Sequence, residues 1–248
     1  MIEGALNFRD VGGLRTRDGR VLRGGRVFRC GALDAVTDAG LAQLSALGLK
    51  VYVDLRSNVE RRLKPPRLPP LDPPRVVFRD HDRLTGALYH ELAQAGDGAG
   101  LARRRMLALY EELPYVHRVS YRMLLRELVD APGQPLAFGC AAGKDRTGIG
   151  ALLLLTALGV AEEDIERDYL ESGLHVDALV KVFFTGSRAA IELDQRSRWE
   201  PILRTDADYL ASARRAIVRH SGSVEAYLSS ELGIGPAETA ALRAALLD

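Results

Sequence analysis

Short apolar runs alternate with amphipathic stretches along the first half of the chain. The predicted strands share β-branched or aromatic composition and are residues 26–30, 50–55, 75–78 and 135–138. The predicted helices share apolar side chains at helical spacing and are residues 37–47, 101–112 and 116–129. This alternation predicts an α/β fold with a mostly parallel central sheet flanked by helices.

Local signals mark where these elements begin and end. Thr37 is a typical helix N-cap, Gly48 a typical helix stop, and a run of prolines within residues 65–74 predicts a loop. Residues 162–247 are helical in pattern almost throughout. Because neither an internal repeat nor a linker is visible, we expect residues 1–248 to form a single domain with a helical C-terminal part.

Composition excludes several classes of protein. With 47% hydrophobic and 27% charged residues the chain is too apolar for disorder, and a net charge of +1 gives no overall attraction to nucleic acid. The longest apolar stretch, residues 149–160, is shorter than the roughly 20 residues of a membrane span. The N-terminus carries no secretory signal, and two cysteines make no disulfide framework. We therefore expect a cytoplasmic protein without integral membrane association, although leaderless secretion would leave no signal.

The segment of residues 138–148, FGCAAGKDRTG, carries the chemistry. It lies between a predicted strand and an apolar helix, with Cys140 and Arg146 six positions apart. The backbone N–H groups of such a small-residue loop, together with the helix N-terminus, can bind one oxyanion. Arg146 can fork two N–H bonds onto phosphate oxygens, and the positive surroundings favour a nucleophilic thiolate at Cys140. The predicted phosphate-binding residues are Ala141, Ala142, Gly143, Lys144, Asp145, Arg146 and Thr147.

Other phosphate and metal motifs are absent from the sequence. A Walker loop requires glycine five positions before Gly143, where Phe138 stands, and Asp145 follows Lys144 in place of Ser or Thr. The dinucleotide fingerprint is also missing, and the five histidines show no metal-ligand spacing. Since thiolate chemistry needs neither, we expect no metal and no cofactor.

The run CAAGKDRTG resembles the Cys-x5-Arg-Thr/Ser signature of the protein tyrosine phosphatase superfamily. More narrowly, the chain resembles the bacterial tyrosine and lipid phosphatases typified by mycobacterial tyrosine phosphatase B. The supporting blocks occur in the family's order over nearly the whole chain and are residues 7–13 (NFRDVGG), 26–31, 53–57 and 222–228. This resemblance implies a phosphatase fold and a cysteine-dependent phosphatase activity.

The resemblance also implies roles for individual residues. Cys140 would be the nucleophile that forms a phosphocysteine, and Arg146 would clamp the phosphate. Asp145 would be the general acid, with Asp80 and then Asp82 as alternatives from the loop after residues 75–78.

Further roles surround this centre. Lys144 would pair with a second phosphate or with Asp80, and Thr147 would bond the thiolate or cap the helix. Residues 172–203 would form a helical lid. Supporting roles fall to Arg9, Asp10, Asp54 and Arg56, and Cys30 is interpreted as a core thiol rather than a redox partner.

One position departs from the resembled pattern. Gly139 stands where these phosphatases usually carry histidine before the cysteine, which should weaken thiolate stabilisation or loosen the loop and so reduce activity. A weakly active or non-catalytic phosphate-binding protein is therefore one alternative, and a rhodanese-like sulfurtransferase is another. The expected partners are phosphotyrosine-type, phosphoserine/threonine or phosphoinositide substrates. The sequence determines neither the choice among them nor the oligomeric state.

Overall fold

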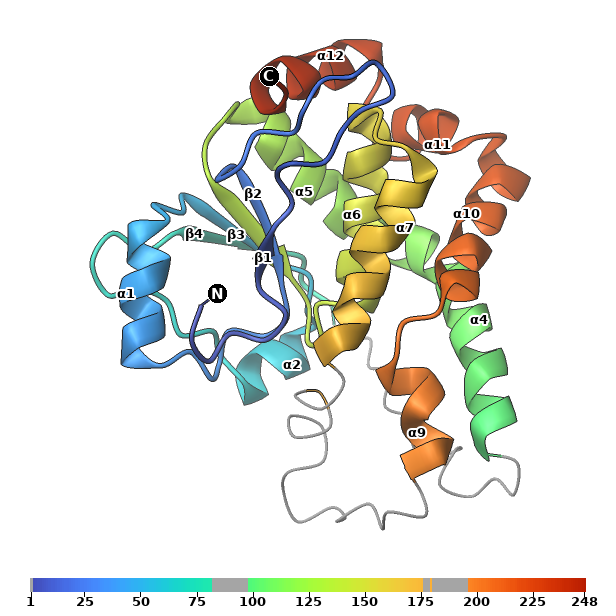
Figure 1. Ribbon diagram of the computed structural model, residues 1–248, viewed down its shortest axis with the longest axis horizontal. Helices are drawn as coiled ribbons and strands as arrows, with labels where there is room; N and C mark the ends of the chain where they lie inside the picture. Colours follow the sequence, from blue (N-terminus) through green and yellow to red (C-terminus); the bar gives the residue numbers. More distant parts are fainter. Residues whose placement is uncertain (1, 82–97, 176–178, 180–195) are drawn as a thin grey trace.

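The structure, a computed structural model, describes residues 2–81, 98–175, 179 and 196–248 (Figure 1). Within these residues a five-stranded sheet has the order β1-β2-β5-β3-β4. Strands β2 to β5 are mutually parallel, and only β1 pairs antiparallel, with β2. The strands are β1 (Arg9–Asp10), β2 (Val27–Cys30), β3 (Val51–Asp54), β4 (Arg75–Phe78) and β5 (Leu136–Gly139). The predicted α/β class and mostly parallel sheet are thereby confirmed.

Helices cover both faces of the sheet, as Figure 1 shows for α1 on one side and α5 and α6 on the other. Side chains at alternating strand positions point to opposite faces of the sheet and so join two different cores. Tyr52 and Ala137 pack in a small core with Leu44 of α1, whereas Val53 and Phe138 join the main core. Strands β2, β3 and β5 are buried along their whole length, which is why they lack the polar alternation of a half-exposed strand.

The helices are α1 (Asp38–Ala46), α2 (Asn58–Leu63), α4 (Gly98–Val116), α5 (Arg118–Asp130), α6 (Asp145–Leu158), α7 (Glu162–Glu171), η1 (Ser172–His175, 3-10), α9 (Arg196–Leu203), α10 (Ala207–Ser221), α11 (Val224–Ser230) and α12 (Pro236–Leu246). Thr37 caps α1 as predicted, its hydroxyl accepting from the Gly40 N–H. Helix α2 was not predicted, and α4 continues through Pro114. None of the described helices is long and apolar enough to cross a membrane.

The lid predicted over residues 172–203 is described only at its two ends. Residues 172–175 form η1 and residues 196–203 form α9, while residues 176–178 and 180–195 lie outside the described part. Leu179, Ile202 and Leu203 are buried in the main core. This core also joins the sheet to α10, α11 and α12, which supports our proposal of a single domain.

Candidate active site

The predicted phosphate loop connects β5, the central strand of the sheet, to the N-terminus of α6. Its tight path depends on Gly143, whose φ of +70° lies in the left-handed region. A Cβ atom at Gly143 would lie 2.6 Å from the backbone nitrogen of Gly31, so no other residue fits there. The loop therefore lies at the carboxyl end of the central strand, where open α/β sheets bind ligands.

The carbonyl groups of Gly139, Ala141, Ala142 and Gly143 are directed at neighbouring segments of the chain. The oxygens of Gly139 and Ala141 accept from backbone N–H groups of neighbouring segments at 2.8 and 3.0 Å. The Gly143 oxygen accepts from Asn7 Nδ2 and from Arg29 Nη2, each at 3.0 Å. Asn7 Nδ2 also lies 3.4 Å from the Ala142 oxygen.

This arrangement determines where the amides point. In a trans peptide the N–H group is antiparallel to the carbonyl group, so outward carbonyls turn the following N–H groups inward. Within the described part of the chain, the N–H groups of residues 141–146 donate to no protein acceptor. Free amides converging at a helix N-terminus form an anion-binding nest.

Arg146 is held beside this nest by Glu60. Its Nη1 and Nη2 atoms each donate to one carboxylate oxygen of Glu60 at 2.7 Å, and Nη1 also lies 3.3 Å from the Leu55 oxygen. A guanidinium has five N–H donors, and these contacts occupy three. Among the described residues the Nε–H and one Nη2–H remain without an acceptor, and these two lie on the same side of the guanidinium. Arg146 can therefore bind Glu60 and two phosphate oxygens at once.

Glu60 was missed in the sequence analysis, although a local signal was present. Ser57 and Glu60 form a reciprocal capping box at the start of α2, with the Ser57 N–H donating to Glu60 at 2.8 Å. Before this box, the buried Arg56 bonds Asp54 at the end of β3. The Ser-x-x-Glu spacing after a strand predicts such a cap, but not its pairing with Arg146.

The ion pair makes stability depend on pH in the acidic range. Burial opposes ionisation of Glu60, but the hydrogen bonds and charge of Arg146 prevail and lower its pKa from 4.5 to about 2. A carboxyl with a lowered folded-state pKa contributes stability that is present above the unfolded value and lost as pH falls through the folded value. We expect Tm to fall between pH 4.5 and 2 less steeply in Glu60→Gln than in the wild type.

Thermal denaturation followed by circular dichroism over this range would test the prediction. Glu111→Gln, which removes one partner of the exposed pair with Arg219, is the matched control and should keep the wild-type slope. Parallel Tm curves for the wild type and Glu60→Gln would contradict the assignment.

Cys140 and Cys30 lie on opposite sides of the sheet. Cys140 belongs to the main core and Cys30 to the core beneath α1. Burial raises the pKa of the Cys30 thiol, which is consistent with a neutral core residue. A Cβ atom at Gly139 would lie 2.7 Å from both the Cys30 oxygen and its Sγ atom. Cys30 fills the space next to Gly139, so a larger residue at position 139 would collide with it.

The candidate acids differ in their surroundings. Oδ1 of Asp145 accepts from Lys144 Nζ and, at 2.7 Å, from the hydroxyl of Tyr110. The described contacts leave Oδ2 of Asp145 unpartnered. Asp80 is exposed and accepts from Asn58, and Asp82 lies outside the described residues. Lys144 is buried and pairs with Asp145, not with Asp80 as one prediction had it.

The remaining predicted residues lie around the loop. Thr147 is buried with its hydroxyl 3.5 Å from the Cys30 oxygen, so it turns toward β2 and not toward the Cys140 thiol. Arg9 donates to Asn7 and Asp168, in keeping with a supporting role. Asp10 accepts from backbone N–H groups of two nearby glycines and stabilises a local turn.

Two histidines near Arg146 have lowered pKa values. Burial, followed by the charge of Arg146, lowers the pKa of His117 to about 3. His81 lies against it, with ring centroids 5.4 Å apart, and burial likewise lowers its pKa. His117 is therefore neutral between pH 5 and 8, and we expect no inflection of the activity profile from it there.

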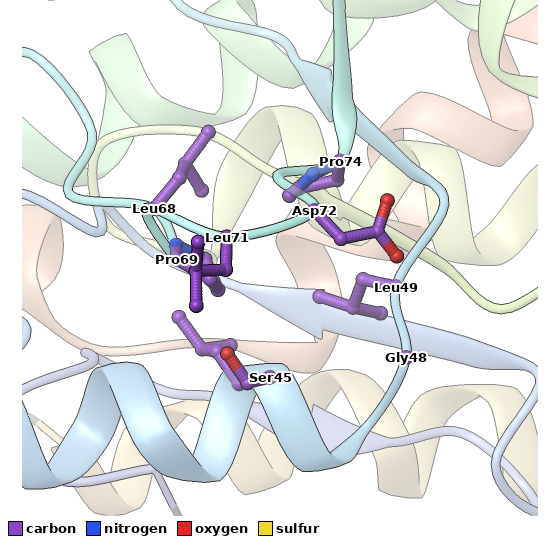
Figure 2. A pocket seen from close by; sticks show the side chains of 9 residues that line it. Ser45, Gly48, Leu49, Leu68, Pro69, Leu71, Asp72 and Pro74 are labelled. Atoms are coloured by element: carbon purple, nitrogen blue, oxygen red, sulfur yellow. The ribbon is translucent and has the colours of Figure 1, made fainter.

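A separate hollow lies between the end of α1 and the proline-rich segment (Figure 2). Its walls are mainly apolar and include Leu44, Leu49, Leu68 and Pro74. Its titratable member, Asp72, pairs with Lys50 at 2.8 Å. Because no residue of the phosphate loop lines this hollow, we assign it no part in catalysis.

The chain is an α/β protein in which a loop with free backbone N–H groups lies at the carboxyl end of the central strand. The chain belongs to the tyrosine phosphatase family, whose sequence profile matches residues 1–248. Membership of this family makes the protein a phosphatase and leaves the sulfurtransferase alternative without support.

Individual relatives agree with this assignment. A Cupriavidus necator protein whose name places it provisionally among the tyrosine-protein phosphatases is 34% identical, covering 94% of this chain and 83% of the relative. The triple specificity protein phosphatase PtpB of Mycobacterium tuberculosis is 32% identical, covering 99% and 98% respectively. A solved structure, TpbA of P. aeruginosa, is 15% identical with a TM-score of 0.26, covering 78% of this chain and 89% of TpbA, and carries no argument here.

Proposed function

We propose that the protein hydrolyses phosphate monoesters through a phosphocysteine at Cys140. The observation that carries this proposal is the loop of residues 140–146. The carbonyls of Ala141, Ala142 and Gly143 bond to neighbouring segments, while the N–H groups of residues 141–146 and one side of Arg146 have no acceptor among the described residues. A thiol, a cation and a set of free amides on one loop suit a dianionic phosphate ester.

The first step transfers the phosphoryl group to sulfur. The Cys140 thiolate attacks phosphorus in line, so the S–P bond forms as the bond to the ester oxygen breaks. The loop amides and the free side of Arg146 stabilise the charge on the three remaining oxygens. The departing oxygen takes a proton from an aspartic acid.

The second step regenerates the enzyme. A water molecule attacks phosphorus, its oxygen forms the new P–O bond, and the S–P bond breaks to restore the thiolate. The proton released by the water returns to the same aspartate, so that inorganic phosphate leaves and no net charge is consumed.

We propose Asp145 as the acid in preference to Asp80 and Asp82. Asp145 lies in the first turn of α6, on the phosphate loop itself, with Oδ1 held by two donors and Oδ2 available. Asp80 is exposed and paired with Asn58. A residue that must reach the leaving oxygen needs such fixed geometry.

Leaving-group dependence tests this choice. We expect Asp145→Asn to lower kcat roughly 100-fold for phenyl phosphate, whose leaving group needs a proton. The effect on 2,4-dinitrophenyl phosphate, which needs none, should be much smaller. Asp80→Asn serves as the matched control with little effect on either substrate, and a reversed pattern would reassign the acid to Asp80.

The substrate class is tested with a panel of phosphotyrosine, phosphoserine and phosphothreonine peptides and soluble phosphoinositides. We propose activity on phosphotyrosine first, and on the other classes by analogy with the triple specificity named for the mycobacterial relative. Phosphate binding without turnover of any member between pH 5 and 8 would favour the non-catalytic alternative. A cytoplasmic location remains a prediction.

A further inference from the structure

We propose that residues 168–172, the C-terminal turn of α7 and the residue after it, position both the phosphate loop and the general acid Asp145. This inference rests on the proposed function. Asp168 and Ser172 hold the back of the phosphate loop through Arg29. Tyr169, on the same turn, holds Asp145 through Tyr110. We expect none of the five residues Arg29, Tyr110, Asp168, Tyr169 and Ser172 to touch the phosphate, so each is a positioning residue.

We call the contacts from Asp168 and Ser172 to the phosphate loop the first arm, and those from Tyr169 to Asp145 the second arm. Arg29 is the centre of the first arm. It lies in β2, is fully buried, and donates to Asp168, to the Ser172 hydroxyl at 3.3 Å and to the Gly143 oxygen at 3.0 Å. Burying an arginine is costly unless its charge and donors are matched, and Asp168 supplies the opposite charge.

Arg9 and Asn7 complete this support from the N-terminal segment. Arg9 donates to Oδ1 of Asp168 at 3.2 Å and to the Ser172 hydroxyl at 3.1 Å. It also bonds the oxygen of the Asn7 amide, which turns Nδ2 of Asn7 toward the Gly143 oxygen. Asn7 keeps this position at a φ of +50°, a conformation that asparagine tolerates better than most residues.

The consequence for the loop is a fixed peptide orientation. The Gly143 oxygen accepts from both Arg29 and Asn7, so rotating the peptide between residues 143 and 144 would break two hydrogen bonds. The N–H group of Lys144 must then point into the nest.

The second arm runs through two tyrosine hydroxyls. Tyr110 of α4 lies 2.7 Å from Oδ1 of Asp145 and 2.7 Å from the hydroxyl of Tyr169. A hydroxyl has one proton to give, and a carboxylate can only accept. Tyr110 therefore donates to Asp145 and accepts from Tyr169, which orients the carboxyl group so that Oδ2 is the oxygen available for proton transfer.

The two arms predict different kinetic effects. Asp168→Asn and Arg29→Lys should lower kcat/KM at least about 10-fold for phenyl phosphate and 2,4-dinitrophenyl phosphate alike, because the amides are misplaced. Both should weaken competitive inhibition by inorganic phosphate. Tyr169→Phe should lower kcat several-fold for phenyl phosphate only, and leave inhibition by phosphate unchanged.

Matched variants separate positioning from loss of stability. Glu127→Gln removes the partner of Arg75 away from the loop, and Tyr227→Phe removes a buried hydroxyl that bonds the Pro114 oxygen. Both should leave the kinetics unchanged. If the charged variants do not fold, Ser172→Ala, which removes only a hydroxyl, decides the first arm by the same measurements.

The proposal is overturned if the folded variants of either arm behave as their controls do, or if Tyr169→Phe affects both substrates equally. Assaying Cys140→Ser in parallel distinguishes a failure of the proposed function from a failure of the positioning role. Activity surviving in that variant would refute the proposed function itself. An inactive Cys140→Ser with unaffected α7 variants would refute only the positioning role.

Discussion

Cys140→Ser is expected to abolish turnover, with kcat lowered by roughly 10⁴-fold or more. The change replaces one atom in a buried side chain, so the loop should keep its shape. A serine hydroxyl does not ionise near neutral pH, so it is a far weaker nucleophile than a thiolate. Steady-state rates with p-nitrophenyl phosphate and a phosphotyrosine peptide measure the loss.

The control for this variant is Cys30→Ser. Cys30 is also buried and carries the same functional group, but it lies on the other side of the sheet. It should retain activity, and Cys140→Ser should still bind inorganic phosphate in calorimetry because the amides remain in place. Turnover by Cys140→Ser at the wild-type rate would refute the nucleophile assignment.

Removal of the Arg146 guanidinium should have the next largest effect. We expect Arg146→Ala to lower kcat by roughly 10³-fold and to weaken phosphate binding, since it removes two donors that have no acceptor among the described residues. Arg146→Lys keeps the charge but cannot bond Glu60 and two phosphate oxygens together, so it should recover only part of the activity.

The carboxylate of Glu60 should weaken phosphate binding further in Arg146→Ala. In Arg146→Ala, Glu60 would be left as an unpaired anion beside the phosphate site. The double variant Arg146→Ala/Glu60→Gln should therefore bind phosphate more tightly than Arg146→Ala alone. The control is Arg126→Ala, which removes a guanidinium that donates to the Gly233 oxygen and pairs with Glu238. Equal phosphate affinities in the single and double variants would contradict this electrostatic argument.

Elements with strong local signals were predictable from the sequence. The four parallel strands were found because each is a short run rich in apolar, β-branched or aromatic residues, although β4 is not buried. Helix α1 was found because Thr37 and Gly48 mark its ends. The two-residue strand β1 is too short for any periodicity. Helix α2 has no buried face, so its pattern carries no apolar stripe, although its capping box was legible.

Side-chain pairing was beyond the sequence analysis. Arg146 and Glu60 are 86 residues apart, Arg29 and Asp168 are 139 apart, and Tyr110 and Tyr169 are 59 apart. Such pairs leave no periodic trace, because either partner alone is compatible with a surface position. They become specific only when the sheet and its helices bring distant segments together.

The sequence by itself determined the chemistry of the site: a cysteine and an arginine on one small-residue loop between a strand and a helix, a relation set by neighbours along the chain. Only the tertiary structure decided which way each peptide of that loop faces, which N–H groups of Arg146 stay free, and which oxygen of Asp145 is held. The physical reason is that buried polar groups must find partners, and those partners come from strands and helices far away in the chain.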